Sequence, residues 1–128
     1  MMRNESEKRK TLVQDLLDTL HTEIVKNTLF VVEGKRDVVS LNKLGVKRIM
    51  MLDKPLFAIV EEIAKTEKKM ILLVDLDDEG KKLYSKLSVD LGHHGVFVDN
   101  TIRDLLFKLP VRHIEGLATF VENEMNKE

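Results

Sequence analysis

Three carboxylates stand directly after two apolar runs of the sequence, at points where buried strands would end. Glu33 follows the run LFVV, and Asp75 and Asp77 follow the run MILLV. Carboxylates at this spacing can hold a divalent cation or move a proton. Two full negative charges about 4 Å apart repel by about 4 kcal/mol at an effective dielectric near 20. A Mg²⁺ ion prefers oxygen ligands and would offset that repulsion.

The two runs predict the elements that position these side chains. LFVV and KMILLV are near-continuous aliphatic stretches, which is typical of strands buried on both faces of a parallel sheet. Shorter strands are predicted in VKRIMM, GVFVD and VRHIEG, and helices in DVVSLNKLG, DKPLFAIVEEIAK, KKLYSKLSVDL, NTIRDLLFKL and the C-terminal segment. Asp53 is expected as the N-cap of the second of these helices, with Pro55 in its first turn. The alternation predicts an α/β fold with a mainly parallel central sheet of four or five strands and helices on both faces.

A further helix is predicted before the first strand. Apolar residues recur there every three or four positions and form the stripe of an amphipathic helix over residues 6–25, comprising Leu12, Val13, Leu16, Leu17, Leu20 and Ile24. This helix should pack on the domain as an outer layer. We therefore expect an N-terminal helical segment over residues 1–27 and an α/β domain over residues 28–128.

Ligand sites of open parallel sheets form just beyond the C-terminal ends of the strands. If LFVV and KMILLV are neighbours, Glu33, Asp75 and Asp77 converge on one edge of the sheet. Gly34 and Gly80 would then let the backbone come close to whatever occupies the space between them. The sequence thus predicts a cation site at that edge.

These residues resemble a known family. VVEGKRD, followed some forty residues later by LVDLDDEG, is similar to the Toprim domain, the catalytic module of bacterial-type primases, topoisomerases and certain small ribonucleases and repair proteins. The resemblance covers about residues 28–116. The closing VRHIEGLATFVE resembles the tail of small, stand-alone archaeal and bacterial Toprim proteins described as primase-like.

The resemblance implies a Mg²⁺-dependent phosphoryl-transfer site, in which Mn²⁺ could replace Mg²⁺. Glu33 would act as general acid/base and as a metal ligand, beside the metal ligands Asp75 and Asp77. The supporting positions that match the family pattern are Gly34, Asp37 and Gly80.

Several neighbouring residues also have structural interpretations. Asp37 belongs equally well to the site or to the first turn of the helix that follows it. Asp78 and Glu79 are better explained as first-turn residues favoured by the helix dipole than as ligands. His93 and His94 lie between glycines, which favours a polar turn over a transition-metal site.

Positive charges accompany both motifs. Lys35 and Arg36 follow Glu33, and Lys81, Lys82 and Lys86 follow the aspartates, so they could hold phosphates or simply form a solvated helix face. The aromatic residues do not suggest a stacking platform for single strands. Four phenylalanines fall at apolar periodic positions and are expected in the core, namely Phe30, Phe57, Phe97 and Phe107.

Composition limits the partners. The net charge of −1 over 128 residues gives no global field that would concentrate nucleic acid or anionic lipid. RNA or DNA would bind weakly to the chain alone, and tight binding would need a protein partner or a homo-oligomer. The absence of cysteine and the polar start MMRNESEKRK predict a cytoplasmic protein without a membrane segment.

Two functions from different classes are consistent with the sequence. The first is an enzyme that cuts or joins phosphodiester bonds in RNA or DNA processing, as a nuclease or a primase does. The second is a non-catalytic Mg²⁺-binding module that docks on a nucleic-acid-processing complex.

Overall fold

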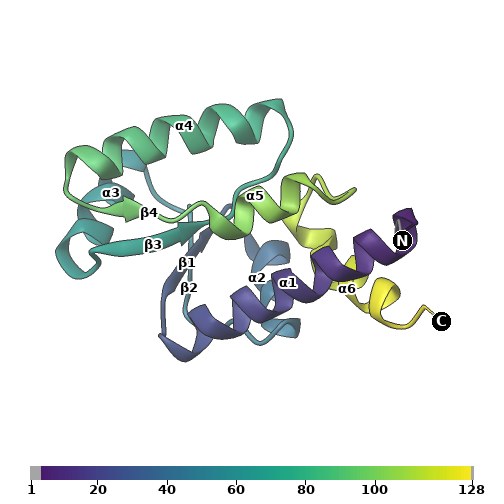
Figure 1. The fold of residues 1–128 in the computed structure, drawn as a ribbon. Helices are drawn as coiled ribbons and strands as arrows, with labels where there is room; N and C mark the ends of the chain where they lie inside the picture. Colours follow the sequence, from purple (N-terminus) through teal and green to yellow (C-terminus); the bar gives the residue numbers. More distant parts are fainter. Residues whose placement is uncertain (1–3, 128) are drawn as a thin grey trace.

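The computed structural model describes residues 4–127 and contains one four-stranded, all-parallel sheet with helices on both faces (Figure 1). The order across the sheet is β2-β1-β3-β4. The strands are β1 (Leu29–Val32), β2 (Ile49–Met51), β3 (Lys69–Leu72) and β4 (Phe97–Val98). This architecture confirms the predicted α/β fold.

The helices fill the intervals between the strands and the two ends of the chain. They are α1 (Glu5–Val25), α2 (Lys35–Lys43), α3 (Leu56–Thr66), α4 (Asp78–His93), α5 (Thr101–Phe107), the 3-10 turn η1 (Ile114–Gly116) and α6 (Leu117–Met125). No helix in the described part of the chain combines the length and apolar character that a membrane crossing requires.

The central strands are buried on both faces because their side chains alternate between two apolar clusters. Phe30 and Val32 of β1 pack with buried residues of α1, α2, α5 and α6. Leu29 and Val31 of the same strand pack with buried residues of α3 and α4. Helices thus cover both faces of the sheet, as parallel sheets require.

Two predicted element boundaries are wrong. Asp53 does not cap the helix after β2, because α3 begins at Leu56 and the carbonyl of Pro55 accepts its first hydrogen bonds. VRHIEG does not form a strand. Its Arg112 carbonyl accepts a hydrogen bond from the Leu76 amide, and the chain then enters η1.

Three of the four phenylalanines expected in the core are exposed. Phe30 is fully buried, but Phe57, Phe97 and Phe107 are 70%, 62% and 40% exposed. Phe97 lies on β4, a two-residue strand at the edge of the sheet. Short apolar periodicity therefore did not distinguish the covered face of an element from its open face.

A candidate metal centre at the carboxyl edge of the sheet

The structure brings the two acidic motifs together because β1 and β3 are adjacent. Glu33 directly follows β1, and one of its carboxylate oxygens accepts a hydrogen bond of 3.0 Å from the backbone amide of Asp75. A residue 42 positions away in the sequence is thereby held at the end of the neighbouring strand.

Asp75 is bound to three different parts of the chain. Its amide donates to Glu33, and its carbonyl accepts from the Arg103 guanidinium at 3.2 Å. One carboxylate oxygen accepts from the Ile114 amide at 2.9 Å, and the other lies 3.2 Å from Nδ1 of His113. These contacts fix the direction in which the carboxylate points.

Asp77 is the N-cap of α4. Its Oδ1 accepts from the Gly80 amide at 2.8 Å, while Oδ2 lies 4.0 Å from Nδ1 of His113. Gly80 packs directly against the chain that carries Asp75, and a Cβ built there would lie 1.9 Å from the Asp75 carbonyl oxygen. Only glycine permits this close approach, so it is the neighbouring strand end that requires Gly80.

Asp75, Asp77 and His113 form a compact group of donors. Each offers one ligand atom, and all three atoms lie within 4.8 Å of one another. Carboxylates are ligands that Mg²⁺ and Mn²⁺ accept, and an imidazole nitrogen is a common ligand of transition metals. The residues present therefore fit a divalent cation.

His113 was missing from the sequence-based set because its segment was assigned to a strand. The two histidines that had been considered lie elsewhere, at the C-terminal end of α4, where His94 Nδ1 is 2.8 Å from the Asp90 carbonyl. One signal in the sequence could have identified His113 as a candidate. It is a polar residue beside charged neighbours, in a segment too short to predict a strand reliably.

Glu33, Gly34 and Asp37 lie beside this group. Among the described residues, the compact set of donors does not include Glu33, whose role as acid/base and ligand stays a prediction. Asp37 accepts a hydrogen bond of 3.1 Å from the Gly34 amide and so supports the start of α2. An added Cβ at Gly34 would meet nothing within 4 Å, so the space in front of it is open.

A buried cation lies beneath the cluster. Arg103 of α5 is 3% exposed and donates to the carbonyls of Val74, at 2.6 Å, and Asp75. Its guanidinium carbon lies 4.3 Å from the Tyr84 ring centroid and 5.1 Å from that of Phe107. Burial lowers the pKa of Arg103, and the negative charges of Asp75 and Glu33 oppose that shift.

The acidic surroundings also affect two other groups. The hydrogen bond to Asp75, together with the negative charges of Asp75 and Asp77, raises the pKa of His113. Burial raises the pKa of Asp37, and the charges of Asp75 and Glu33 add to that effect. Burial is the main cause for Asp37 and the hydrogen bond to Asp75 for His113, and the nearby carboxylates favour the protonated form of both groups.

The family model for the Toprim domain matches residues 28–102, which is more than half of the chain. A UPF0292 protein of Methanocaldococcus jannaschii is 37% identical over 101 residues, covering 74% of this chain and 79% of the relative. A UPF0292 protein of Methanosarcina acetivorans is 33% identical over 125 residues, covering 94% and 87%. The chain belongs to the Toprim-domain UPF0292 family.

A solved structure shares the fold. A putative protein from Aquifex aeolicus superimposes with a TM-score of 0.68 at 30% identity, covering 89% of this chain and 98% of that one. Toprim membership associates the chain, at a coarse level, with metal-dependent processing of nucleic acids. The matched segment contains Glu33, Asp75 and Asp77, whereas Arg103 and His113 lie beyond it.

The basic residues of this Toprim protein are arranged around the same edge at the start of two helices. Lys35 and Arg36 begin α2, and the exposed Arg36 lies 3.8 Å from Glu115. Lys81 and Lys82 lie in the first turns of α4 and are exposed, with Lys81 over the Phe107 ring at 5.6 Å. Their contact with phosphates stays a prediction.

Proposed function

We propose that this protein is a metal-dependent phosphoryl-transfer enzyme that acts on phosphodiester bonds of RNA or DNA, as a nuclease or a primase does. The observation that carries the proposal is the group formed by Asp75, Asp77 and His113, whose ligand atoms lie within 4.8 Å of one another. This group lies beside Glu33 at the carboxyl edge of the sheet, where open parallel sheets form their ligand sites.

In this proposal Asp75, Asp77 and His113 hold a divalent cation, with Mg²⁺ and Mn²⁺ as the metals to test. A bound cation neutralises charge that builds on the phosphoryl group during transfer. Glu33 moves a proton at the attacking or leaving oxygen. Arg103 and the Ile114 amide keep Asp75 in position through the bonds described above.

Substrate would be held by the exposed cations that flank the cluster. Lys35 and Arg36 start one helix, and Lys81 and Lys82 lie in the first turns of another, so phosphates on either side of the scissile bond can meet positive charge. The net charge of −1 makes binding by a single chain weak. A protein partner or a second copy would strengthen it.

A second function is favoured by one specific contact. The Glu33 carboxylate already accepts a hydrogen bond from the Asp75 amide. Among residues 4–127, which the structure describes, the compact group of metal donors does not include Glu33. A side chain used to join two strand ends could serve structure rather than proton transfer. The protein would then be a metal-binding module that docks on a nucleic-acid-processing complex.

The purified protein incubated with end-labelled single- and double-stranded RNA and DNA would separate the two functions. We expect cleavage or joining in Mg²⁺ or Mn²⁺, no reaction in EDTA, and a fall of about 100-fold or more in Glu33→Gln. Glu61→Gln, an exposed glutamate of α3, is the matched control and should react like wild type.

Two results would count against the enzyme. Cleavage that is unchanged in Glu33→Gln would assign the activity to a contaminant or to another site. Absence of reaction on every substrate, with cation binding intact by calorimetry, would favour the docking module.

A further inference from the structure

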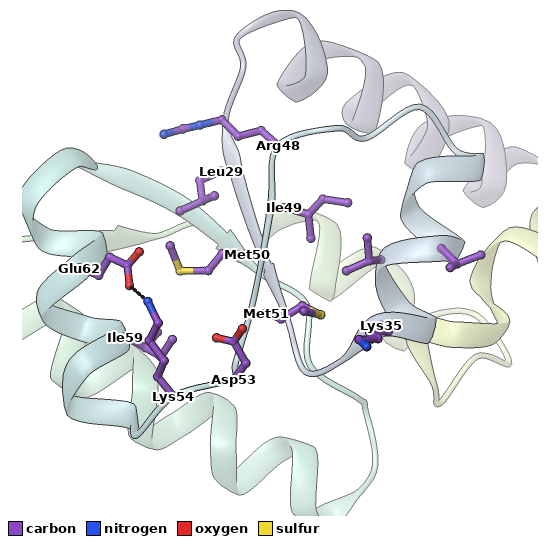
Figure 2. Close-up of a pocket in the computed structure, with 12 residues that line it drawn as sticks. Leu29, Lys35, Arg48, Ile49, Met50, Met51, Asp53, Lys54, Ile59 and Glu62 are labelled. Atoms are coloured by element: carbon purple, nitrogen blue, oxygen red, sulfur yellow. Dashed lines mark hydrogen bonds and ion pairs between the residues drawn. The ribbon is translucent and has the colours of Figure 1, made fainter.

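A groove lies away from the carboxylate cluster, along the open edge of β2 (Figure 2). It has a volume of about 730 Å³. The open edge of β2 forms its floor, with the side chain of Met50 toward α3 and those of Ile49 and Met51 toward α2. Val39 of α2 and Ile59 of α3 contribute to its walls. All three floor residues are half-buried, and Val39 is 53% exposed. The groove therefore presents an apolar strip beside a strand edge.

The backbone of β2 has hydrogen-bonding groups free on that side. β2 lies at the end of the sheet order and pairs with β1. The Phe30 amide donates to the Arg48 carbonyl, and the Leu52 amide donates to the Val32 carbonyl. Residues of a strand alternate in the direction of their backbone groups, so Arg48, Met50 and Leu52 point toward β1. The amide and carbonyl groups of Ile49 and Met51 point out into the groove.

The charges at the two ends of β2 are complementary to each other. Lys47 precedes the strand and Asp53 follows it, and both are exposed. Two of the three cations that line the groove are already paired, since Arg48 lies 2.7 Å from Glu67 and Lys54 lies 2.8 Å from Glu62, and the third is Lys35. Among the residues that the structure describes, neither Lys47 nor Asp53 has such an ion pair.

These observations select one register for a second copy of the strand. If two β2 strands lie antiparallel about a two-fold axis at Met50, Ile49 of each copy faces Met51 of the other. These are the residues whose backbone groups point outward, so the pairing forms four new backbone hydrogen bonds. The same register sets Lys47 opposite Asp53 at both ends of the interface.

We propose that the β2 edge is the interface of a homodimer, in which two sheets join into one continuous eight-stranded sheet. A C2 interface must be self-complementary, and both the outward backbone groups and the Lys47–Asp53 charges meet that condition. Burial of the apolar floor and of Val39 supplies the attraction. This interface goes beyond the proposed enzymatic function and does not depend on it.

The pairing also has a geometric consequence for the carboxylate edge. In a parallel sheet, Asp53 lies at the same end as Glu33. Antiparallel pairing therefore brings Lys47 of the second copy to that end of the sheet. Each monomer gains a positive charge from its neighbour on the side nearest Lys35, which lines the groove.

Sedimentation equilibrium of the full chain tests the interface. We expect wild type to show a monomer–dimer equilibrium, and Lys47→Asp and Asp53→Lys each to raise the dissociation constant about tenfold, because two ion pairs become two like-charge contacts. The double variant Lys47→Asp/Asp53→Lys should restore the wild-type constant. Lys108→Asp, an exposed lysine elsewhere, is the charge-matched control and should dimerise like wild type.

A second variant tests the backbone bonds. Met51→Pro removes an amide that points out into the groove and leaves the bonds between β1 and β2 in place. It should be a monomer with a circular dichroism spectrum like that of wild type. If Met51→Pro does not fold, the charge-reversal series decides the question alone.

Three results would overturn the proposal. The first is a wild-type chain that stays monomeric up to about 1 mM, a concentration that allows only very weak association. The second is a dimer whose dissociation constant is unchanged by both single charge reversals. The third is a dimer that both single variants weaken and the double variant does not restore, which would exclude this register.

Discussion

At the scale of single residues, the two glycines of the motifs have different physical roles. A side chain at Gly80 would collide with the Asp75 carbonyl, whereas Gly34 faces open space and has an extended backbone with φ of −153°. We expect Gly80→Ala to lower the free energy of unfolding by about 1–3 kcal/mol through overpacking. Gly34→Ala should stay within about 0.5 kcal/mol of wild type.

Urea unfolding of both variants in EDTA would measure this difference without any effect of a bound cation. Equal stability of the two alanine variants would mean that the backbone near Asp75 can shift at little cost in free energy. The close approach at Gly80 would then have no energetic importance.

His113 introduces a nitrogen donor into a set otherwise made of carboxylates. If it binds the cation, His113→Ala should weaken Mn²⁺ and Co²⁺ binding by about tenfold or more and Mg²⁺ binding by less. Calorimetry with each metal measures the constants, and the Co²⁺ absorption spectrum reports the ligand set directly. His94→Ala, a histidine at the end of α4, is the matched control.

An unchanged Co²⁺ spectrum in His113→Ala would show that the imidazole is no ligand. The bond between His113 and Asp75 would then only orient the carboxylate.

At the scale of elements, the start of α2 joins structure to the electrostatics of the cluster. Asp37 accepts the Gly34 amide, yet burial and nearby carboxylates raise its pKa. A raised folded-state pKa means that the folded protein binds this proton more tightly than the unfolded chain does. Protonation of Asp37 therefore stabilises the fold at low pH. This stabilisation is lost as the pH rises from the pKa of the unfolded chain, 3.8, through the raised pKa of the folded protein.

Asp37→Asn should remove the loss of stability that accompanies the rise in pH. It should keep the hydrogen bond, because its amide oxygen can still accept from the Gly34 amide. We expect the variant to melt at a higher temperature than wild type near pH 7, with the difference closing as the pH falls toward 4. Asp37→Ala loses the bond and should cost about 0.5–1 kcal/mol. A stability gap between Asp37→Asn and wild type that widens on acidification would contradict this account.

The elements that the sequence predicted best are those in which burial on both faces leaves a plain signal. LFVV and KMILLV are continuous aliphatic runs because each strand packs on helices above and below it. The carboxylates Glu33 and Asp75 could be placed together because adjacent parallel strands end at one edge. The family resemblance identified Gly80 as a position of the motif. It did not explain why glycine is needed there.

The parts that were missed depend on contacts distant in sequence. VRHIEG is apolar enough for a strand, but the Ile114 amide bonds to Asp75 and the chain turns into η1. Arg103 resembles any helical arginine until α5 is placed over the end of β3. Local pattern carries no information about such pairings, so neither His113 nor Arg103 could be assigned from spacing.

At the scale of the whole molecule, cation binding should be coupled to folding. A cation that binds only the folded state with a dissociation constant of about 1 mM adds about 1.4 kcal/mol at about 10 mM. For a domain of this size the melting temperature would rise by roughly 4–7 °C. Thermal melts in EDTA and in Mg²⁺ at matched ionic strength measure the shift.

Asp77→Asn should separate the two effects of that carboxylate. Its amide oxygen can still cap α4 through the Gly80 amide, while one negative charge leaves the cluster. We expect a higher melting temperature than wild type in EDTA and the loss of most of the Mg²⁺ shift, because a neutral oxygen is a weaker ligand. Asp78→Asn, the exposed neighbour in the first turn, should retain the full shift.

A variant at Asp77 that is less stable in EDTA and keeps the full Mg²⁺ increment would identify Asp77 as a structural residue. The cation would then bind elsewhere.

The bonds that hold Asp75 also order events in time. Arg103, His113 and the Ile114 amide lie later in the sequence than Glu33, Asp75 and Asp77, so the ribosome adds them afterwards. A nascent chain that has emerged only as far as α4 has its acidic motifs without the groups that orient Asp75. The candidate cation site can therefore assemble only after α5 and η1 have been added to the chain, so translation delays any chemistry at that site until these elements are present.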